Sequence, residues 1–173
     1  MGDGATGVQL VGARLLMDKQ DHPPVAVRPP ILFGGALVLA AILEALVPLG
    51  PGFAGGNLRS NAVGLLIAVL GAALFGLAVS TFLRAGTNVP TRQPTLALVE
   101  HGPYRISRNP IYIAMTLFYF GLATVFTSVW ALLFLPVILG VIHYGVVLRE
   151  EAYLTQKFGA AYASYQARVP RWL

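Results

Sequence analysis

The sequence predicts an all-α fold, a polytopic membrane bundle of four transmembrane helices, and three observations support this fold class. Hydrophobic residues make up 56% of the 173-residue chain and charged residues only 11%, whereas a soluble domain carries about 25% charged residues. The mean hydropathy is +0.69, and the apolar residues gather in three long blocks. A soluble enzyme and a disordered chain are therefore excluded, and the absence of cysteine excludes a disulfide-stabilised scaffold.

The apolar blocks cover residues 31–49, 62–83 and 111–147. The first contains one charged residue, Glu44, and the other two contain no Asp, Glu, Lys or Arg. A membrane-spanning helix needs about 20 residues, so the first two blocks each predict one span. The third block would reach about 55 Å as a single helix, nearly twice the hydrocarbon thickness, so it must form two helices. Thr127 and Ser128 are the polar pair near its middle, and the hairpin turn is expected there.

The distribution of positive charge predicts the orientation. Arg59 lies between the first two spans, and the other eleven of the twelve Lys and Arg residues precede the first span, follow the second or follow the fourth. The positive-inside rule places that side in the cytoplasm, so both termini and the loop 87–109 are expected there. The chain divides into a cytoplasmic N-terminal segment (1–30) without a recognisable signal peptide, two transmembrane helices (31–83) and a C-terminal unit (84–173).

Two features within the spans suggest how the helices pack. Ala72, Gly76 and Ser80 recur at four-residue spacing, which predicts a face where another helix approaches closely. Glu44 lies one turn from Pro48 near the end of its span, and its carboxylate is expected to reach the water of the headgroup region.

Residues capable of chemistry gather in two stretches on the predicted cytoplasmic side. In the first, residues 88–112, prolines 90, 94, 103 and 110 stiffen the chain. Pro110 suits the first turn of the third helix, and the side chain of Asn109 is expected to cap it. Such a helix N-terminus favours an anionic group.

The second stretch runs from Arg149 to Trp172. Glu150 and Glu151 stand at the expected C-terminal end of the fourth span, where negative charge is unfavourable, so a cationic ligand would compensate them. His143 lies seven residues before Glu150, two turns back on the same helical face. Leu154, Phe158, Tyr162 and Tyr165 recur at helical spacing and predict an amphipathic C-terminal helix. Arginine and tyrosine near a membrane boundary are also typical of interface anchors, so it is the joint arrangement that favours a site.

These stretches resemble two signatures of the isoprenylcysteine carboxyl methyltransferase family and, more loosely, of the phospholipid methyltransferases grouped with it. The first signature reads LVEHGPYRISRNPIY, residues 98–112. The second comprises Glu150-Glu151, Leu154, Phe158-Gly159, Tyr162, Tyr165 and Arg168-Val169-Pro170. Both occur in the expected order around the hairpin, and the similarity covers about residues 88–171.

The resemblance implies an S-adenosylmethionine-dependent methyltransferase in the membrane, which acts on a small lipophilic or lipid-like acceptor arriving between the helices. The hairpin and the C-terminal helix would form a cofactor pocket on the cytoplasmic side. Carried over by motif, the cofactor-binding residues are Leu96, Ala97, Leu98, Val99, His101, Gly102, Tyr104, Asn109, Pro110, Ile111, Tyr112, Glu150 and Glu151. Arg108, Asn109 and Arg149 are the expected catalytic residues, and no metal or nucleic-acid site is expected.

Two positions depart from the carboxyl methyltransferase pattern, since Asn109 replaces a histidine and Val146 replaces an arginine that faces the substrate. A carboxylate acceptor, prenylcysteine in particular, is therefore disfavoured. One alternative is a phospholipid N-methyltransferase, whose amine acceptor needs a proton acceptor such as His101 or His143. The other is a non-catalytic scaffold or lipid-binding subunit. The sequence leaves the acceptor and the oligomeric state open.

Overall fold

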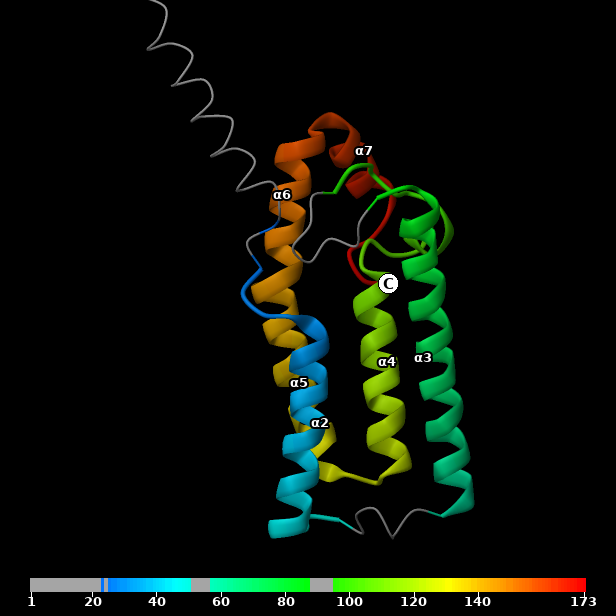
Figure 1. Ribbon diagram of the computed structural model, residues 1–173, viewed down its shortest axis with the longest axis vertical. Helices are drawn as coiled ribbons and strands as arrows, with labels where there is room; N and C mark the ends of the chain where they lie inside the picture. The colour runs from blue at the N-terminus through cyan, green and yellow to red at the C-terminus, as the bar shows by residue number, and fades with distance from the viewer. Residues whose placement is uncertain (1–22, 24, 51–56, 88–94) are drawn as a thin grey trace, which may run out of the picture.

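The computed structural model describes residues 23, 25–50, 57–87 and 95–173, so most of the predicted N-terminal segment lies outside the described residues. All regular structure in the described part is helical, as predicted (Figure 1). The long helices are α2 (Pro29–Leu46), α3 (Leu58–Arg84), α4 (Pro110–Val125) and α5 (Val129–Ile142), and α5 continues through the π-helical turn η3 (His143–Val147) into α6 (Leu148–Phe158). A short 3₁₀ helix, η2 (Gly102–Arg105), and the terminal α7 (Ala160–Arg168) complete the order.

The chain is an integral membrane protein. Three helical stretches of the described residues are long and apolar enough to cross a membrane, Pro29–Leu46, Leu58–Arg84 and the continuous Val129–Phe158, and Pro110–Val125 is a shorter apolar helix. The third apolar block breaks where expected, because Thr127 has a φ of 47° and the hydroxyl of Ser128 caps α5 by accepting a hydrogen bond from the Ala131 amide at 3.3 Å. The predicted hairpin is thereby confirmed.

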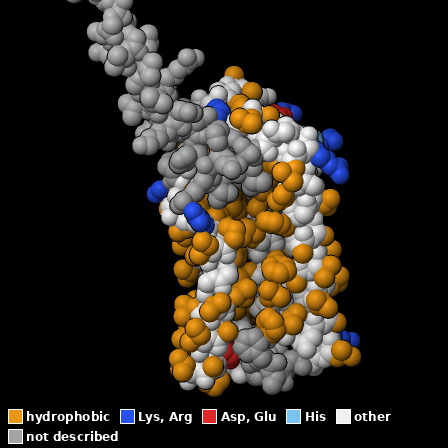
Figure 2. Space-filling view, viewed as in Figure 1, with side chains coloured by type: hydrophobic (Ala, Val, Ile, Leu, Met, Phe, Trp, Pro, Cys, Tyr) orange, Lys and Arg blue, Asp and Glu red, His pale blue; other side chains and the backbone are white. Residues whose placement is uncertain are grey.

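Charged and apolar side chains are segregated along the bundle. In Figure 2 hydrophobic side chains cover the middle of the visible face, and most Lys and Arg side chains lie toward the end that carries α7. Arg59 stands in the first turns of α3, whereas Arg84 ends that helix and Arg108 precedes α4. Arg59 is therefore at the opposite end of the bundle from Arg84 and Arg108, and the predicted orientation depends on this difference.

Helices α3 and α4 approach each other at backbone distance. Gly64 and Gly71 of α3 are buried against α4, where a Cβ on Gly71 would come within 2.5 Å of the Phe118 nitrogen and one on Gly64 within 2.7 Å of the Val125 nitrogen. Gly121 of α4 faces the backbone of Ala68 in the same way. In lipid, such close approach stabilises a helix pair through dispersion contacts.

The small-residue face predicted from Ala72, Gly76 and Ser80 is wrong. Ala72 and Gly76 are exposed, and a Cβ on Gly76 would meet no atom within 4 Å. Because α3 carries small residues on more than one side, spacing alone did not reveal which side faces α4.

The expectation that Glu44 reaches headgroup water is also wrong. Its side chain is 6% exposed, and the Ser128 hydroxyl donates to its Oε2 at 3.3 Å. Next to it, the Trp130 indole nitrogen donates to the Val47 carbonyl at 2.8 Å. The end of α2 packs on the turn between α4 and α5, and this contact removes Glu44 from water.

The sequence predicted that the fourth span ends near Glu150, and this prediction is wrong. The helix runs on to Phe158, so the two acids do not face a helix C-terminus. Within this helix the π-turn inserts one extra residue and rotates the residues after it by about 100°. His143 therefore does not share the face of Glu150 that regular helical spacing implies; its ring lies 6.0 Å from the ring of Trp172. The Gly145 carbonyl in the π-turn accepts a hydrogen bond from the Ala26 amide at 3.0 Å, which ties the approach to α2 against this helix.

The C-terminal amphipathic helix forms as two pieces, α6 and α7, because Gly159 between them has a φ of 50°, a conformation that glycine adopts easily. Tyr162 and Tyr165 are buried together with Val169, and Leu98 of the loop packs against them. The bend therefore lays α7 on the loop before α4.

Replacing Gly71 by leucine should lower the free energy of unfolding by about 1–3 kcal/mol, since the added side chain has no room against α4. Thermal unfolding in detergent measures the change. The matched control is Gly76→Leu on the same helix, which has open space around it and is expected to leave the melting temperature nearly unchanged. Equal melting temperatures for the two variants would contradict the α3–α4 contact.

Candidate functional site

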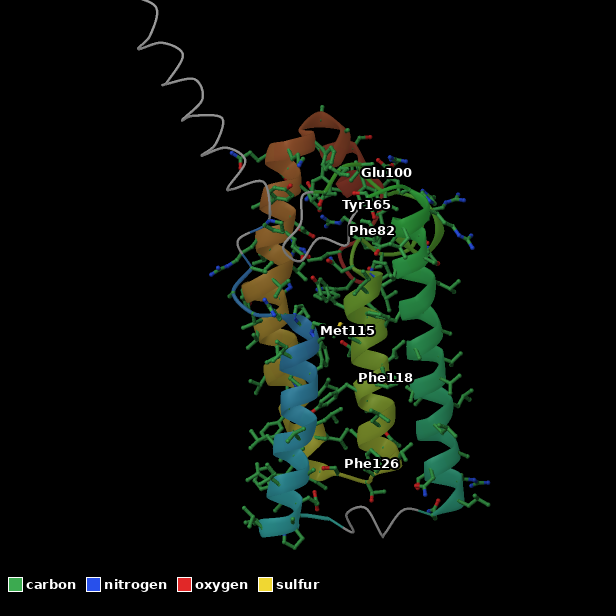
Figure 3. All side chains as sticks on the ribbon, in the orientation of Figure 1. Phe82, Glu100, Met115, Phe118, Phe126 and Tyr165 are labelled. Atoms are coloured by element: carbon green, nitrogen blue, oxygen red, sulfur yellow. The ribbon has the colours of Figure 1, made fainter. Side chains whose placement is uncertain are left out.

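A cavity of about 120 Å³ lies at the end of the bundle covered by α7 and the 95–109 segment; we call it the loop-end cavity. Figure 3 shows Phe82 and Tyr165, which line it, near this end of the molecule. Its walls come from the start of α2, from α3, from the loop, from the start of α4 and from α6 and α7. The lining residues are Pro29, Pro30, Phe75, Phe82, Thr95, Ala97, Leu98, Val99, Tyr104, Arg108, Asn109, Pro110, Ile111, Tyr112, Met115, Glu150, Glu151, Leu154, Tyr162 and Tyr165.

The C-terminal tail holds the loop that carries the first motif. The Arg108 amide donates to the Pro170 carbonyl at 3.0 Å, and the Ser107 hydroxyl and the Asn109 side-chain amide donate to the Arg171 carbonyl at 3.1 and 3.0 Å. Asn109 therefore does not cap α4 through its side chain, contrary to the prediction. Its side-chain amide is instead used, together with the Ser107 hydroxyl, to satisfy the partly buried Arg171 carbonyl.

Two further hydrogen bonds shape the loop. The Tyr165 hydroxyl donates to the Tyr104 carbonyl at 2.7 Å, and the Thr87 hydroxyl accepts from the Leu96 amide at 2.8 Å. The first contact fixes η2 against α7, and the second fixes the start of the described loop against the end of α3. The cavity wall is therefore built by side chains rather than by regular secondary structure.

Glu150 is a buried carboxylate without a basic partner. It is 6% exposed. The Tyr112 hydroxyl donates to its carboxylate and lies 2.8 Å from Oε1 and 2.9 Å from Oε2. Among the described residues, no Lys or Arg forms a salt bridge with it. A buried carboxylate of this kind favours a cationic ligand.

Glu151 has the opposite environment, because it lies between two arginines. Arg108 Nη1 lies 3.0 Å from its Oε1, and Arg171 donates to both its oxygens, from Nε at 3.0 Å and from Nη2 at 2.9 Å. The hydrogen bonds to Glu151 raise the pKa of Arg171 above its ordinary value. Glu151 thus joins the loop, α6 and the tail, and its charge is already neutralised.

Three side chains of the cavity lining have buried polar atoms with no hydrogen-bond partner among the described residues: Tyr104 (OH), Thr95 (Oγ1) and Arg108 (Nε). Buried polar groups are rarely left unpaired unless a ligand or an ordered water completes them. Burial raises the pKa of Tyr104 well above its ordinary value, so its hydroxyl remains a neutral donor. The cavity therefore offers one carboxylate and several unused donors to a ligand.

Aromatic rings form much of the remaining wall. Phe82 and Tyr104 pack edge to face with ring centroids 4.9 Å apart, and the rings of Tyr162 and Tyr165 lie 6.0 Å apart. Burial raises the pKa of Tyr162 to about 12, with a further contribution from the charge of Glu151. Neutral aromatic faces of this kind attract cations.

Most of the residues expected from sequence come together at this cavity. Those in its lining are Ala97, Leu98, Val99, Tyr104, Arg108, Asn109, Pro110, Ile111, Tyr112, Glu150 and Glu151. Leu96, His101, Gly102 and Arg149 are outside it: Leu96 is 64% exposed, and the other three are also exposed. The functional roles of all these residues remain predictions.

Sequence reasoning missed part of the wall. Leu154, Tyr162 and Tyr165 belong to the second motif and could have been included on that signal. Pro29, Pro30, Phe75, Phe82, Thr95 and Met115 carry no motif and reach the cavity through helix packing. Arg171 was counted only as a positive charge, and its pairing with Glu151 has no signature in the sequence.

A second cavity, which we call the apolar chamber, adjoins the first. It encloses about 360 Å³ between α2, α3 and α4 and shares Pro30, Phe75 and Met115 with the loop-end cavity. Deeper in the bundle it is lined by residues such as Gly34, Leu37, Phe118 and Tyr119. Met115 and Phe118 can be followed along α4 in Figure 3. The polar site thus continues into an apolar space at the depth of the membrane.

Replacing Glu151 by glutamine should lower the free energy of unfolding by about 3–5 kcal/mol, because it leaves the charge of Arg108, whose side chain is only 11% exposed, uncompensated. Thermal and denaturant unfolding measure the change. Glu100→Gln is the matched control: Glu100 pairs with Arg168 at 2.6 Å on the surface, and such pairs contribute about 1 kcal/mol or less. Similar losses in both variants would mean that Glu151 does not organise the site.

The comparison with protein families agrees with the motifs. The model described as phospholipid methyltransferase matches residues 60–161, more than half of the chain, from the first turn of α3 into α7. No curated protein and no solved structure gives a significant match. The matched residues contain the loop, the hairpin and both acids of the loop-end cavity. The chain therefore belongs to the phospholipid methyltransferase family, whose activity is methyl transfer.

Proposed function

We propose that the protein transfers a methyl group from S-adenosylmethionine to a small lipophilic or lipid-like acceptor, and that the loop-end cavity binds this cofactor. The observation that carries the proposal is the buried carboxyl group of Glu150, which has no basic partner among the described residues, in a cavity that also holds polar groups without a hydrogen-bond partner there. The apolar chamber, which shares Pro30, Phe75 and Met115 with this cavity, supports an acceptor that arrives from the membrane.

The residues present fit the charged groups of the cofactor. Glu150 would bind its ammonium group or its ribose hydroxyls, and Arg108, whose Nε has no partner, would bind its carboxylate. The neutral rings of Tyr104 and Tyr112 would face positive charge, an attraction of about 0.5–2 kcal/mol. When bound, S-adenosylmethionine supplies an electrophilic methyl group on a positively charged sulfur.

The protein itself would position the two reactants and exclude water from the cavity. Tyr112 fixes the Glu150 carboxylate, and the tail fixes the loop through Arg108 and Asn109. Holding two reactants in a productive geometry can lower a barrier by about 7–11 kcal/mol. Phe82, Val99 and Ile111 give the cavity an apolar lining, which keeps bulk water away from a reactive methyl group.

The family match favours a phospholipid headgroup as the acceptor. An amine acceptor must be unprotonated when it reacts, and His101 and His143 were the predicted proton acceptors. Neither histidine lines the cavity; His101 is exposed, and His143 is half-buried beside Trp172. An amine would therefore have to arrive unprotonated or release its proton to Glu150.

We also propose that the loop-end cavity and both termini face the cytoplasm. Arg84, Arg108, Arg168 and Arg171 belong to the end with the cavity, whereas Arg59 begins α3 at the other end. This asymmetry follows the positive-inside rule.

Glu150→Gln should weaken S-adenosylmethionine binding by at least about ten-fold, because a hydrogen bond to a charged group contributes about 1.5–3 kcal/mol. Calorimetry on the detergent-solubilised protein measures the affinity. Glu100→Gln, the same change at a carboxylate outside the cavity, should bind like the wild type. Absence of cofactor binding to the wild type in both detergent and nanodiscs would eliminate the proposal. A lower melting temperature with unchanged affinity in Glu150→Gln would make Glu150 a structural residue.

Gly34→Leu should impair methylation of the lipid acceptor several-fold or more and leave cofactor affinity unchanged, because the side chain would fill the apolar chamber, where Gly34 has open space. The assay follows tritiated methyl transfer from the cofactor into a lipid extract. Gly140→Leu on α5, also in open space and outside the chamber, is the control. If wild-type transfer is absent, or if it persists unchanged in both Glu150→Ala and Tyr104→Phe, the scaffold or lipid-binding alternative is favoured.

A further inference from the structure

A separate apolar groove of about 610 Å³ runs between α2 and α5, two helices that pack side by side (Figure 1). Its lining shares no residue with the loop-end cavity or the apolar chamber. Gly35 lines the groove, whereas the preceding Gly34 lines the chamber, and successive helical residues point about 100° apart. The groove and the chamber therefore lie on different sides of α2.

The walls of the groove are apolar and open to the surroundings. Ile31 of α2 is 63% exposed and Val137 of α5 is 62% exposed. Leu39 marks the deep end on α2, and Phe134 and Ile138 complete the wall on α5. Because α2 and α5 are among the apolar membrane helices, a hydrocarbon chain would be the natural contact for this surface.

One end of the groove is positively charged. Arg28, directly before α2, is the charged residue among those that line it. The Arg28 side chain is exposed, and within the described part of the chain it forms neither a hydrogen bond nor a salt bridge. Its guanidinium group therefore remains available for a planar, bidentate interaction of the kind that phosphate accepts.

The length of the groove matches one leaflet. From Arg28 to Leu39 the helix advances eleven residues, or about 16 Å, and half of a 30 Å hydrocarbon core is about 15 Å. A lipid whose phosphate lies at Arg28 would therefore extend one acyl chain along the groove to about the middle of the bilayer.

We propose that this groove binds an anionic phospholipid from the leaflet on the arginine-rich side, with its phosphate on Arg28 and one acyl chain between α2 and α5. The lipid would be a bound, unreacted molecule, because the groove does not join the cavity that contains Glu150. The inference does not depend on which substrate is methylated.

The position of the groove gives the lipid a structural role. At its head the Ala26 amide donates to the Gly145 carbonyl, so the approach to α2 and the π-turn already meet there. Pro29 and Pro30 at the start of α2 line the loop-end cavity, and α5 continues into the helix that carries Glu150. A lipid bridging α2 and α5 would hold these two parts of the cavity wall together.

The first test is lipid retention by native mass spectrometry, with the full chain released from nanodiscs that contain phosphatidylglycerol and phosphatidylcholine of identical acyl chains. The wild type should retain phosphatidylglycerol about five-fold better, as expected for one arginine near anionic lipid. Arg28→Ala should remove the preference, and Arg59→Ala at the other end of the bundle should keep it. Equal retention of both lipids by the wild type, or an unchanged preference in Arg28→Ala, would overturn the proposal.

The second test fills the groove. Gly35→Leu, at a position with open space around it, should reduce retention of both lipids. Gly76→Leu on α3, which also has open space and lines neither the groove nor the apolar chamber, should not. Val137→Trp fills the groove from α5 and replaces Gly35→Leu if that variant does not fold. If Gly34→Leu rather than the groove variants abolishes retention, the lipid lies in the apolar chamber and the groove is not the site.

Discussion

A buried carboxylate is stabilised by positive partners, and Glu151 has two from distant parts of the sequence. Arg108 reaches it from the loop before α4, and Arg171 reaches it from the C-terminal tail. Separating Glu151 from Arg108 would leave charge where water hardly reaches, since their side chains are only 9% and 11% exposed. The loop, the long helix and the tail are held together by this cluster, and the wall of the loop-end cavity depends on it.

Glu150, the acid directly before Glu151, does not take part in this cluster. Glu150 lies one residue before Glu151 and so about 100° around the helix. Tyr112 is its partner there, and no arginine of the described residues pairs with it. One acid of the pair thus completes the architecture, and the other presents its carboxyl group to the cavity. Under the proposed function, a cationic cofactor would supply the charge that compensates Glu150, and the protein would not have to.

Helix α2 borders both the apolar chamber and the groove, on two different sides. Gly34 opens the apolar chamber that adjoins the polar site, and Gly35 opens the groove beside α5. At one end of α2 its prolines line the cavity, and at the other Glu44 meets the hydroxyl of Ser128. The helix is therefore fixed at both ends, while cavities remain along its length on two sides. Under the proposed function, this arrangement would admit a lipid without disturbing the geometry of the loop-end cavity.

Composition and the lengths of the apolar blocks determined the fold class, the hairpin at Thr127 and the approximate helix limits, because burial in lipid requires only that each span be long, apolar and internally hydrogen-bonded. The two motifs likewise located most of the cavity lining. Packing alone decided which small residues of α3 meet α4, that Glu44 is buried and that the Asn109 amide binds the tail. It also decided that Arg171 joins Arg108 on Glu151. Such outcomes depend on how each helix is rotated, on one extra residue in a π-turn and on where the tail returns. The periodicity of a single segment does not predict these features. They are decided only when segments that are distant in the sequence pack against each other.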